Sequence, residues 1–440
     1  MIQYKKFYLE YIVIAIPILL ITGPFLPDLF LSTACLFFLI KVIYNRKYFI
    51  FNDNFFKYFI VFWLCLILSS ILGDAKNFFN SIQSSFFYLR FGIFVLIMKY
   101  LINTNKNFPL QFLYSVSTAI LLATFFAMIQ FIYIRAGIID KIIKLYIDTE
   151  TEYFSYHWGS IGASGFNRLT LPFSDWQVVG SFIIRCLPLS FILVLWKIDR
   201  KKISKKESFL IKIFFVLVFF IVWCSGERAS FILLIIQLIL FFLLIEKLRI
   251  FFKKFLVVGI LLVLLSIYID PISKGRMITQ TIDNITDKNK IHFITPIHEA
   301  HIIGAWEIFL NNKYFGAGLK GFRYECFNKD EYLKNPRIIC TTHPHNVFMQ
   351  FLSETGIVGS IFYIISFLIV SLVLFKKFIY NLLNKNRFFI DDYKVCALIG
   401  IFITLWPIAS SGSFFNNWLS IIYFIPVALC FNKLKFKNET

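Results

Sequence analysis

The sequence predicts an all-α polytopic membrane protein with about twelve transmembrane helices and one long loop before the last three. Of the 440 residues, 58% are hydrophobic and only 16% are charged, whereas soluble domains have about a quarter charged residues. Apolar stretches of about 20 residues, the length that spans a bilayer, recur along the chain. Because a backbone in lipid must satisfy its hydrogen bonds within the segment, these stretches are predicted to be helices.

The first apolar stretch is predicted to be a transmembrane helix. It follows Lys5 and Lys6 as a signal peptide would, but it lacks a small-residue cleavage site and leads through Pro24 and Pro27 into the next stretch. The apolar stretches lie at about 8–23, 25–43, 55–73, 78–99, 110–134, 173–196, 209–225, 229–246, 251–269, 346–375, 393–409 and 413–431.

These limits divide the chain into three parts. Residues 1–269 contain nine predicted helices and a loop at about 135–172, residues 270–345 form the long loop, and residues 346–440 contain three helices and a tail.

The net charge of +20 would suit a nucleic-acid partner, but the placement of the basic residues argues against one. They cluster in every second connection: Arg46 and Lys47; Lys99 and Lys106; Lys197, Arg200, Lys201, Lys202, Lys205 and Lys206; Lys247, Arg249, Lys253 and Lys254; Lys376, Lys377, Lys385 and Arg387; and Lys433, Lys435 and Lys437. This alternation follows the positive-inside rule and predicts that these connections and both termini are cytoplasmic. We therefore predict membrane lipid, and no nucleic acid, as a partner.

Two long connections, about 135–172 and 270–345, face outward on this topology. They contain all six histidines: His157, His292, His298, His301, His343 and His345. Residues 301–310 have apolar side chains at helical spacing, which predicts a short interfacial helix. Gly316, Gly318 and Gly321 then mark a turn-rich stretch. No strand precedes this Gly-x-Gly, so it is not a dinucleotide-binding fingerprint.

A Thr-His-Pro-His-Asn sequence ends the long loop at Asn346. A histidine can take a proton from a hydroxyl near neutral pH, and His345 lies at the entrance of the tenth predicted helix. Pro344 makes the segment rigid, and His343 lies close by. A satisfied surface histidine is the simpler alternative. Asn346 has the composition of a helix N-cap.

Three residues of the tenth predicted helix have special properties. Glu354 lies about two turns into the span, where a carboxylate is costly, so it should face a cavity or a partner. A salt bridge is its simpler explanation. Gly356 and Gly359 are predicted to permit close helix packing.

Two of the eight cysteines, Cys326 and Cys340, lie in the long loop, and the other six lie in predicted spans or at their ends. In an oxidising compartment this pair could close a disulfide that holds the following histidine segment. Two free thiols are the alternative. The spacing is too long for the Cys-x-x-Cys pair of a zinc site.

Arginines on the outward side need an explanation, because the positive-inside rule disfavours them there. They are Arg168, Arg228, Arg276, Arg323 and Arg337. Guanidinium groups bind phosphate through paired hydrogen bonds, so several of them converging on one cavity would hold a pyrophosphate. The alternative for each is snorkelling or an ion pair, such as Arg228 with Glu227. Arg90 and Arg185 lie within spans and are predicted to be ion-paired or to face a cavity. No motif for a metal or a cofactor occurs, and we predict neither.

With these features the chain resembles the O-antigen ligase and O-antigen polymerase superfamily. The resemblance rests on the long loop before the last three spans, on His345-Asn346 followed nine residues later by Gly356-Ile357-Val358-Gly359, and on the stretch from Trp306 to Gly318. Arg228 lies where the family has an outer-end arginine. Glu227 departs from the pattern, because the family more often has a small or hydroxyl residue there.

The resemblance implies a GT-C-like fold and a metal-independent, inverting glycosyltransferase of the bacterial inner membrane. Its donor would be a glycan on an undecaprenyl-pyrophosphate carrier. His345 would activate the acceptor hydroxyl, while Arg228, Arg276 and either Arg168 or Arg323 hold the pyrophosphate. A ligase that attaches polysaccharide to the lipid A core is slightly favoured over a polymerase that joins lipid-linked repeat units. A transporter of a lipid-linked substrate is the alternative from another class, although no internal repeat supports it.

Overall fold

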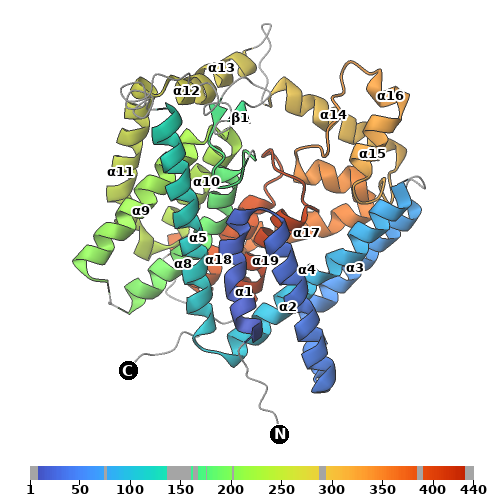
Figure 1. Ribbon diagram of the computed structural model, residues 1–440, viewed down its shortest axis with the longest axis horizontal. Helices are drawn as coiled ribbons and strands as arrows, with labels where there is room; N and C mark the ends of the chain where they lie inside the picture. The colour runs from blue at the N-terminus through green and yellow to red at the C-terminus, as the bar shows by residue number, and fades with distance from the viewer. Residues whose placement is uncertain are drawn as a thin grey trace, which may run out of the picture.

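The computed structural model describes residues 8–73, 77–135, 160–161, 167–174, 176–200, 203–286, 294–383 and 390–431. Helices make up nearly all the regular structure of these residues, which confirms the predicted all-α class (Figure 1). The exception is a short antiparallel pair formed by β1 (Ser160–Ile161) and β2 (Asn167–Arg168).

Each predicted apolar stretch contains a helix. In chain order these are α1 (Tyr8–Leu19), α2 (Phe25–Tyr44), α3 (Asn54–Leu72), α4 (Phe78–Thr104), α5 (Phe108–Gln130), α8 (Val179–Asp199), α9 (Lys205–Cys224), α10 (Arg228–Leu244), α11 (Glu246–Ile269), α17 (Val347–Leu382), α18 (Asp392–Thr404) and α19 (Asn417–Cys430). The 3-10 turns η1 (Leu20–Thr22) and η2 (Tyr48–Phe51) and the π-turn η4 (Phe131–Arg135) adjoin them.

Fewer of these helices are long enough to span a bilayer than the sequence predicts. Among the described residues, seven are long and apolar enough, or eight if Leu256–Ile269 and Pro271–Ile285, bent by 101°, form one span. Helices α1, α10 and α19 are apolar but shorter. The protein is therefore a multi-pass membrane protein by composition, and the count of twelve spans stays a prediction.

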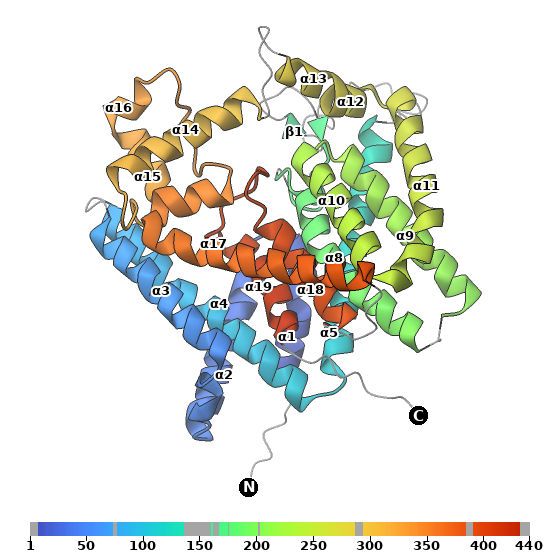
Figure 2. The ribbon, with the colours of Figure 1, turned by 180° about the vertical axis from the view of Figure 1, so that it is seen from behind.

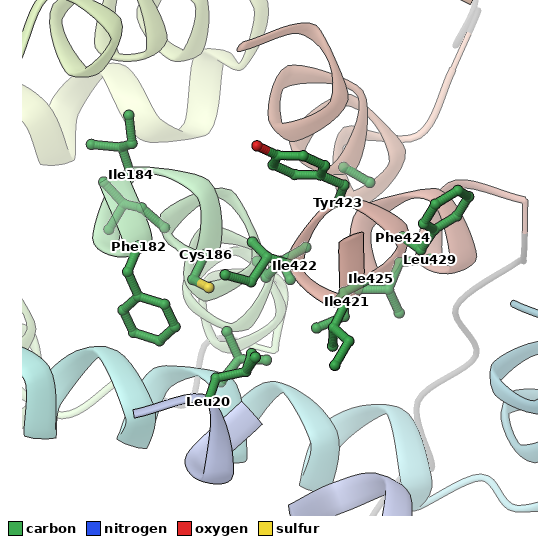
Figure 3. Packing of buried hydrophobic residues seen from close by; sticks show 14 of the residues in the cluster. Leu20, Phe182, Ile184, Cys186, Ile421, Ile422, Tyr423, Phe424, Ile425 and Leu429 are labelled. Carbon is green, nitrogen blue, oxygen red and sulfur yellow. The ribbon is translucent and has the colours of Figure 1, made fainter. Parts of the chain in front are cut away.

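Helix α8 lies at the centre of the bundle. Other parts of the chain bury 89% of its most apolar 18-residue stretch. Large side chains pack α8 against α19 and η1, as Figure 3 shows for Phe182, Ile422 and Leu20. The Phe182 ring also lies 5.9 Å from Trp418 at the start of α19. This contact fixes the end of α8 that faces the long loop.

The two arginines within predicted spans have different partners. Arg90 Nη2 lies 2.8 Å from Asp28 Oδ1, which confirms an ion pair for Arg90. Arg185 donates to Ser181 and lies 5.6 Å from the centre of the Tyr423 ring. Both arginines therefore hold helices together within the bundle.

The long loop folds into short helices that gather at one end of the bundle, at the top of Figure 1 and again at the top of Figure 2. They are α12 (Pro271–Lys274), the π-turn η5 (Gly275–Thr279), α13 (Gln280–Ile285), α14 (Pro296–Asn311), α15 (Gly321–Asn328) and α16 (Asp330–Leu333). The helix predicted over residues 301–310 lies within α14 and is confirmed.

Helix α17 is broken at Gly356, where φ is 61° and ψ is −163°. A side chain at Gly356 would collide with the Tyr314 carbonyl group, and one at Gly316 (φ 70°) would collide with the Glu354–Thr355 backbone. The Ile357 N–H donates to the Lys313 carbonyl at 2.9 Å. The loop before α15 thus fills the break.

The atoms nearest to the two glycines belong to a loop at Gly356 and to the same helix at Gly359, so their predicted role in helix–helix packing stays a prediction. At Gly356 the missing side chain admits a loop, because two left-handed glycines face each other across the contact. At Gly359 it makes room for the side chain of Thr355 on the same helix.

Candidate functional site

Hydrogen bonds on both sides hold the backbone of His345 in place. Asn346 caps α17 by accepting from the Met349 N–H at 3.0 Å, which confirms the N-cap prediction, and its Nδ2 donates to the Pro407 carbonyl at 2.7 Å. The Ser411 N–H donates to the His345 carbonyl at 2.9 Å. His345 has φ 52°, a left-handed conformation that is uncommon for residues other than glycine. The surrounding contacts therefore impose one position on this histidine.

Four histidines, called here the histidine group, lie together: His298 and His301 on α14, and His343 and His345 before α17. The His345 ring centre is 4.1 Å from that of His343, 5.2 Å from His301 and 5.8 Å from His298. His298 and His301 are three residues apart, so they share one face of α14. The other two histidines, His157 and His292, lie outside the described residues.

His301 has a fixed tautomer. Its Nδ1 lies 2.9 Å from the Ile339 carbonyl oxygen. A carbonyl only accepts, so the hydrogen of a neutral His301 is on Nδ1 and its Nε2 has a free lone pair. This bond also ties α14 to the segment before His343.

The histidine group is neutral at pH 7. Burial, followed by nearby positive charges, lowers the pKa of His298 and of His343 to about 4. Burial and the other three histidines lower the pKa of His345 to about 3, from an ordinary 6.5. A neutral imidazole has a lone pair, so His345 can accept a proton at neutral pH.

Three arginines, called here the arginine group, converge at the turn between α9 and α10: Arg168, Arg228 and Arg276. At that turn, a Cβ atom on Gly226 would lie 3.4 Å from Arg276 Cγ and 3.5 Å from Arg168 Cγ. Arg276 Nε donates to the Gly226 carbonyl at 3.4 Å, and Arg228 Nη1 to Thr281 at 3.3 Å. Within the described part of the chain, none of the three forms an ion pair shorter than 4 Å. Glu227 acts electrostatically on Arg168, but within the described residues it is one negative charge against three positive ones, so the group keeps a positive charge that can attract an anion.

Glu227 does not pair with Arg228, so that alternative is wrong. Its two carboxylate oxygens accept from the backbone N–H groups of Gly180 at 2.6 Å and Ser181 at 2.9 Å, and from Ser230 Oγ at 2.9 Å. It thus caps α8, whose N-terminal end favours negative charge. Within the described residues Arg228 therefore forms no ion pair with its neighbour Glu227, which is used to cap α8.

Within the histidine group, all three members of the arginine group act electrostatically on His298. Arg323, by contrast, acts on His343 and Glu354. The structure thus brings Arg168, Arg228 and Arg276 together and places Arg323 at the His343 end.

Glu354 is buried and has partners other than a cation. Gln350 Nε2 donates to its Oε2 at 3.0 Å, and the backbone N–H groups of Lys320 and Phe322 also donate to it. Glu354 therefore joins the first turns of α17 to the start of α15, and the salt-bridge explanation is not needed.

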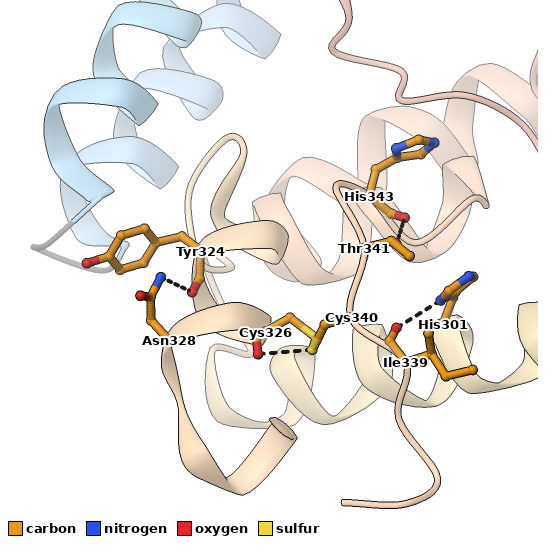
Figure 4. The surroundings of a disulfide bond; sticks show 8 residues. All are labelled: His301, Tyr324, Cys326, Asn328, Ile339, Cys340, Thr341 and His343. Carbon is orange, nitrogen blue, oxygen red and sulfur yellow. Dashed lines mark hydrogen bonds between the residues drawn. A yellow bond between two sulfur atoms is a disulfide. The ribbon is translucent and has the colours of Figure 1, made fainter. Parts of the chain in front are cut away.

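Cys326 in α15 and Cys340 form a disulfide with their Cα atoms 5.4 Å apart (Figure 4). Cys340 lies between two residues that hold histidines. Ile339 accepts from His301 through its carbonyl, and Thr341 Oγ1 donates to the His343 carbonyl at 2.7 Å. The disulfide therefore fixes the segment that holds these two histidines.

We expect loss of the disulfide to lower activity by loosening this segment. A Cys326→Ser, Cys340→Ser double variant loses a cross-link over 14 residues, worth about 3 kcal/mol in the chain-entropy model. The melting temperature and the activity of the variant should both be lower, and a reductant should lower both in the parent protein but not in the variant. An unchanged melting temperature and rate would contradict this role.

Sequence reasoning did not assign a role to His298 or His301. The signal that could have found them was their spacing of three residues at the start of the helix predicted over 301–310, in a loop that contains further histidines. Among the described residues, no three histidine, cysteine or carboxylate side chains are arranged to hold a metal ion.

A family model described as O-antigen ligase matches residues 213–364. The match confirms the resemblance to this superfamily. The matched segment contains the histidine group, Arg228, Arg276 and Arg323, whereas Arg168 lies before it. A comparison with curated proteins finds no similar sequence.

Proposed function

We propose that this protein is a glycosyltransferase of the O-antigen ligase type in the bacterial inner membrane. It would move a glycan from an undecaprenyl-pyrophosphate carrier to a hydroxyl of the lipid A core. The observation that supports this proposal most directly is the neutral histidine group, in which His298 feels the charges of three arginines that form no ion pair shorter than 4 Å among the described residues. The family match over residues 213–364 supports a glycosyltransferase-like enzyme.

In the proposed reaction His345 takes the proton of the acceptor hydroxyl. The hydroxyl oxygen attacks the anomeric carbon from the face opposite the pyrophosphate, so the configuration inverts. The bond between the anomeric carbon and the phosphate oxygen breaks, and its electron pair leaves with the pyrophosphate. Arg168, Arg228 and Arg276 neutralise the charge that develops there. Their three positive charges allow the reaction without a metal ion.

The remaining predicted residues are assigned supporting roles. We propose that Arg323 meets the substrate from the His343 end of the site. Asn346 fixes the backbone of His345, while Glu354, Gly356 and Gly359 shape the start of α17.

The proposed topology places both termini in the cytoplasm and residues 270–345 in the periplasm. The gathering of α12 to α16 at one end of the bundle supports it (Figure 2). So does the separation of the arginine and histidine groups from the basic connections of the predicted cytoplasmic side.

Lipopolysaccharide profiling after deletion of the protein tests the function. For a ligase we expect every long chain to disappear from the core while lipid-linked polymer accumulates. A core capped with a single repeat unit would instead indicate a polymerase. Glycan display that is unchanged in both length and amount would contradict glycan transfer altogether.

A further inference from the structure

His298 lies where the histidine group meets the arginine group. Its ring centre is 5.8 Å from that of His345 and 6.1 Å from that of His301. The positive charges of Arg168, Arg228 and Arg276 all act on it. Its Nδ1 is buried, and within the described residues it has no hydrogen-bond partner. A buried polar atom without a partner costs folding free energy, so this position suits an atom that a ligand satisfies.

Helix α14 presents His298 rigidly. One turn further on, His301 is anchored to the Ile339 carbonyl at 2.9 Å. At Gly304 a Cβ atom would lie 3.0 Å from Ile338 Cγ2, so the helix packs closely on the segment before Cys340. The next residue, Ala305, is fully buried. The position of His298 is therefore fixed before any substrate binds.

The proposed reaction places the breaking bond beside His298. Attack on the anomeric carbon is in line with departure of the phosphate, so the breaking bond lies between the proton acceptor and the cations. His345 is the proposed acceptor, and the arginine group supplies the cations. Of the four histidines in the group, His298 is the one whose pKa all three of these arginines lower.

We propose that His298 is a further catalytic residue that donates a hydrogen bond to the leaving phosphate of the donor. This proposal rests on the proposed function. It gives α14 a direct role in substrate binding, whereas none of the site residues predicted from the sequence lies in this helix.

His298 acts in this proposal as a donor and not as a source of protons. Burial, followed by electrostatic effects from His301 and the arginine group, lowers the pKa of His298 to about 4, so at neutral pH it is an imidazole with a single N–H. The hydroxyl proton passes to His345. The electron pair of the broken bond leaves on the phosphate oxygen, which His298 and the arginines stabilise. His298 has the same proton before and after the transfer.

Two substitutions of His298 in the purified full-length protein test the proposal. His298→Leu removes the donor, and His298→Gln keeps an N–H at similar length. We would measure kcat and the donor KM with a lipid-linked glycan, and inhibition by undecaprenyl pyrophosphate. The leucine variant should lose about ten- to hundredfold in kcat/KM and bind the inhibitor correspondingly less tightly. The glutamine variant should retain most of both.

The neighbouring Ile297 provides the matched control. Its side chain is 58% exposed, so Ile297→Ala changes the same turn of α14 without removing a polar group, and parent kinetics are expected. His298→Leu should fold, because it replaces a buried unpaired nitrogen by an apolar group of similar size. Thermal unfolding of each variant checks this.

The outcomes separate this proposal from the function on which it rests. Parent-like kcat/KM and inhibition in His298→Leu would overturn the role of His298, while an inactive His345→Asn variant in the same assay would keep the proposed function. Full activity in His345→Asn would overturn the proposed function itself. A His298→Gln variant as impaired as His298→Leu, with normal unfolding, would overturn hydrogen-bond donation.

Discussion

Replacing His345 by asparagine is expected to abolish glycan transfer while the protein stays folded. A general base contributes about a hundred- to ten-thousandfold to rate, and His345 is the histidine directly before the N-cap of α17. Asparagine is the suitable substitute because it tolerates the left-handed backbone of His345, where φ is 52°. The rate of transfer from a lipid-linked donor measures the effect.

His345→Ala provides the comparison for this variant. Alanine also removes the base, but it fits the left-handed conformation less well, so it should add a loss of thermal stability. If His345→Asn transfers glycan at the parent rate while His345→Ala does not, then the residue serves the backbone and is not the base.

The pH dependence of the parent enzyme should reflect the lowered pKa of His345. The neutral form accepts the proton, and it persists down to the folded pKa of about 3. The kcat/KM governed by this group should therefore stay level from pH 8 to about pH 5 and fall only in stronger acid. An ordinary histidine would already cause a decline near its pKa of about 6.5. A fall in kcat/KM centred near pH 6.5 would contradict the lowered pKa of His345.

Local sequence signals account well for the helices and their ends. Each long apolar run contains a helix, and seven or eight of the described helices are long and apolar enough to span a bilayer. Asn346 was recognisable as an N-cap because capping needs only a short polar side chain and the three following residues. The count of spans was less predictable, since apolar stretches such as α10 and α19 form helices shorter than the stretches themselves.

The parts that sequence could not predict depend on contacts between distant segments. Glu227 caps α8, which begins 48 residues earlier, at Val179. Gly356 faces Gly316, 40 residues away in the chain. A single sequence does not show which distant residue each one contacts. The sequence therefore suggested an ion pair for Glu227 and helix packing for Gly356, whereas the structure shows a cap on α8 and a contact with a loop.

The site also depends on contacts between segments that are distant in the sequence. Arg168 and Arg276 meet at Gly226 although more than a hundred residues separate them. His298 joins His345 only because α14 folds back over the start of α17. The residue types predicted phosphate binding and proton transfer, but only the tertiary structure separates Arg323 from the arginine group.

Substituting two members of the arginine group should have the second large effect, on binding of the donor. Arg228→Gln and Arg276→Gln each remove hydrogen bonds to a charged group, worth about 1.5–3 kcal/mol, so each should raise the donor KM about ten- to hundredfold. If both guanidinium groups bind one pyrophosphate, as proposed, the double variant should lose less than the sum of the two free energies. Steady-state kinetics with varied donor measure this.

Lysine substitutions distinguish the geometry of these groups from their charge. Arg276→Lys keeps the positive charge but loses the paired donors that match phosphate oxygens, so it should restore only part of the affinity. Arg337→Gln is the matched control, because Arg337 is exposed in the same loop and lies outside the arginine group. Its donor KM should equal that of the parent. If Arg337→Gln raises the donor KM as much as Arg276→Gln does, then the loop attracts the donor by its net charge, and the convergence of Arg168, Arg228 and Arg276 is not what binds the pyrophosphate.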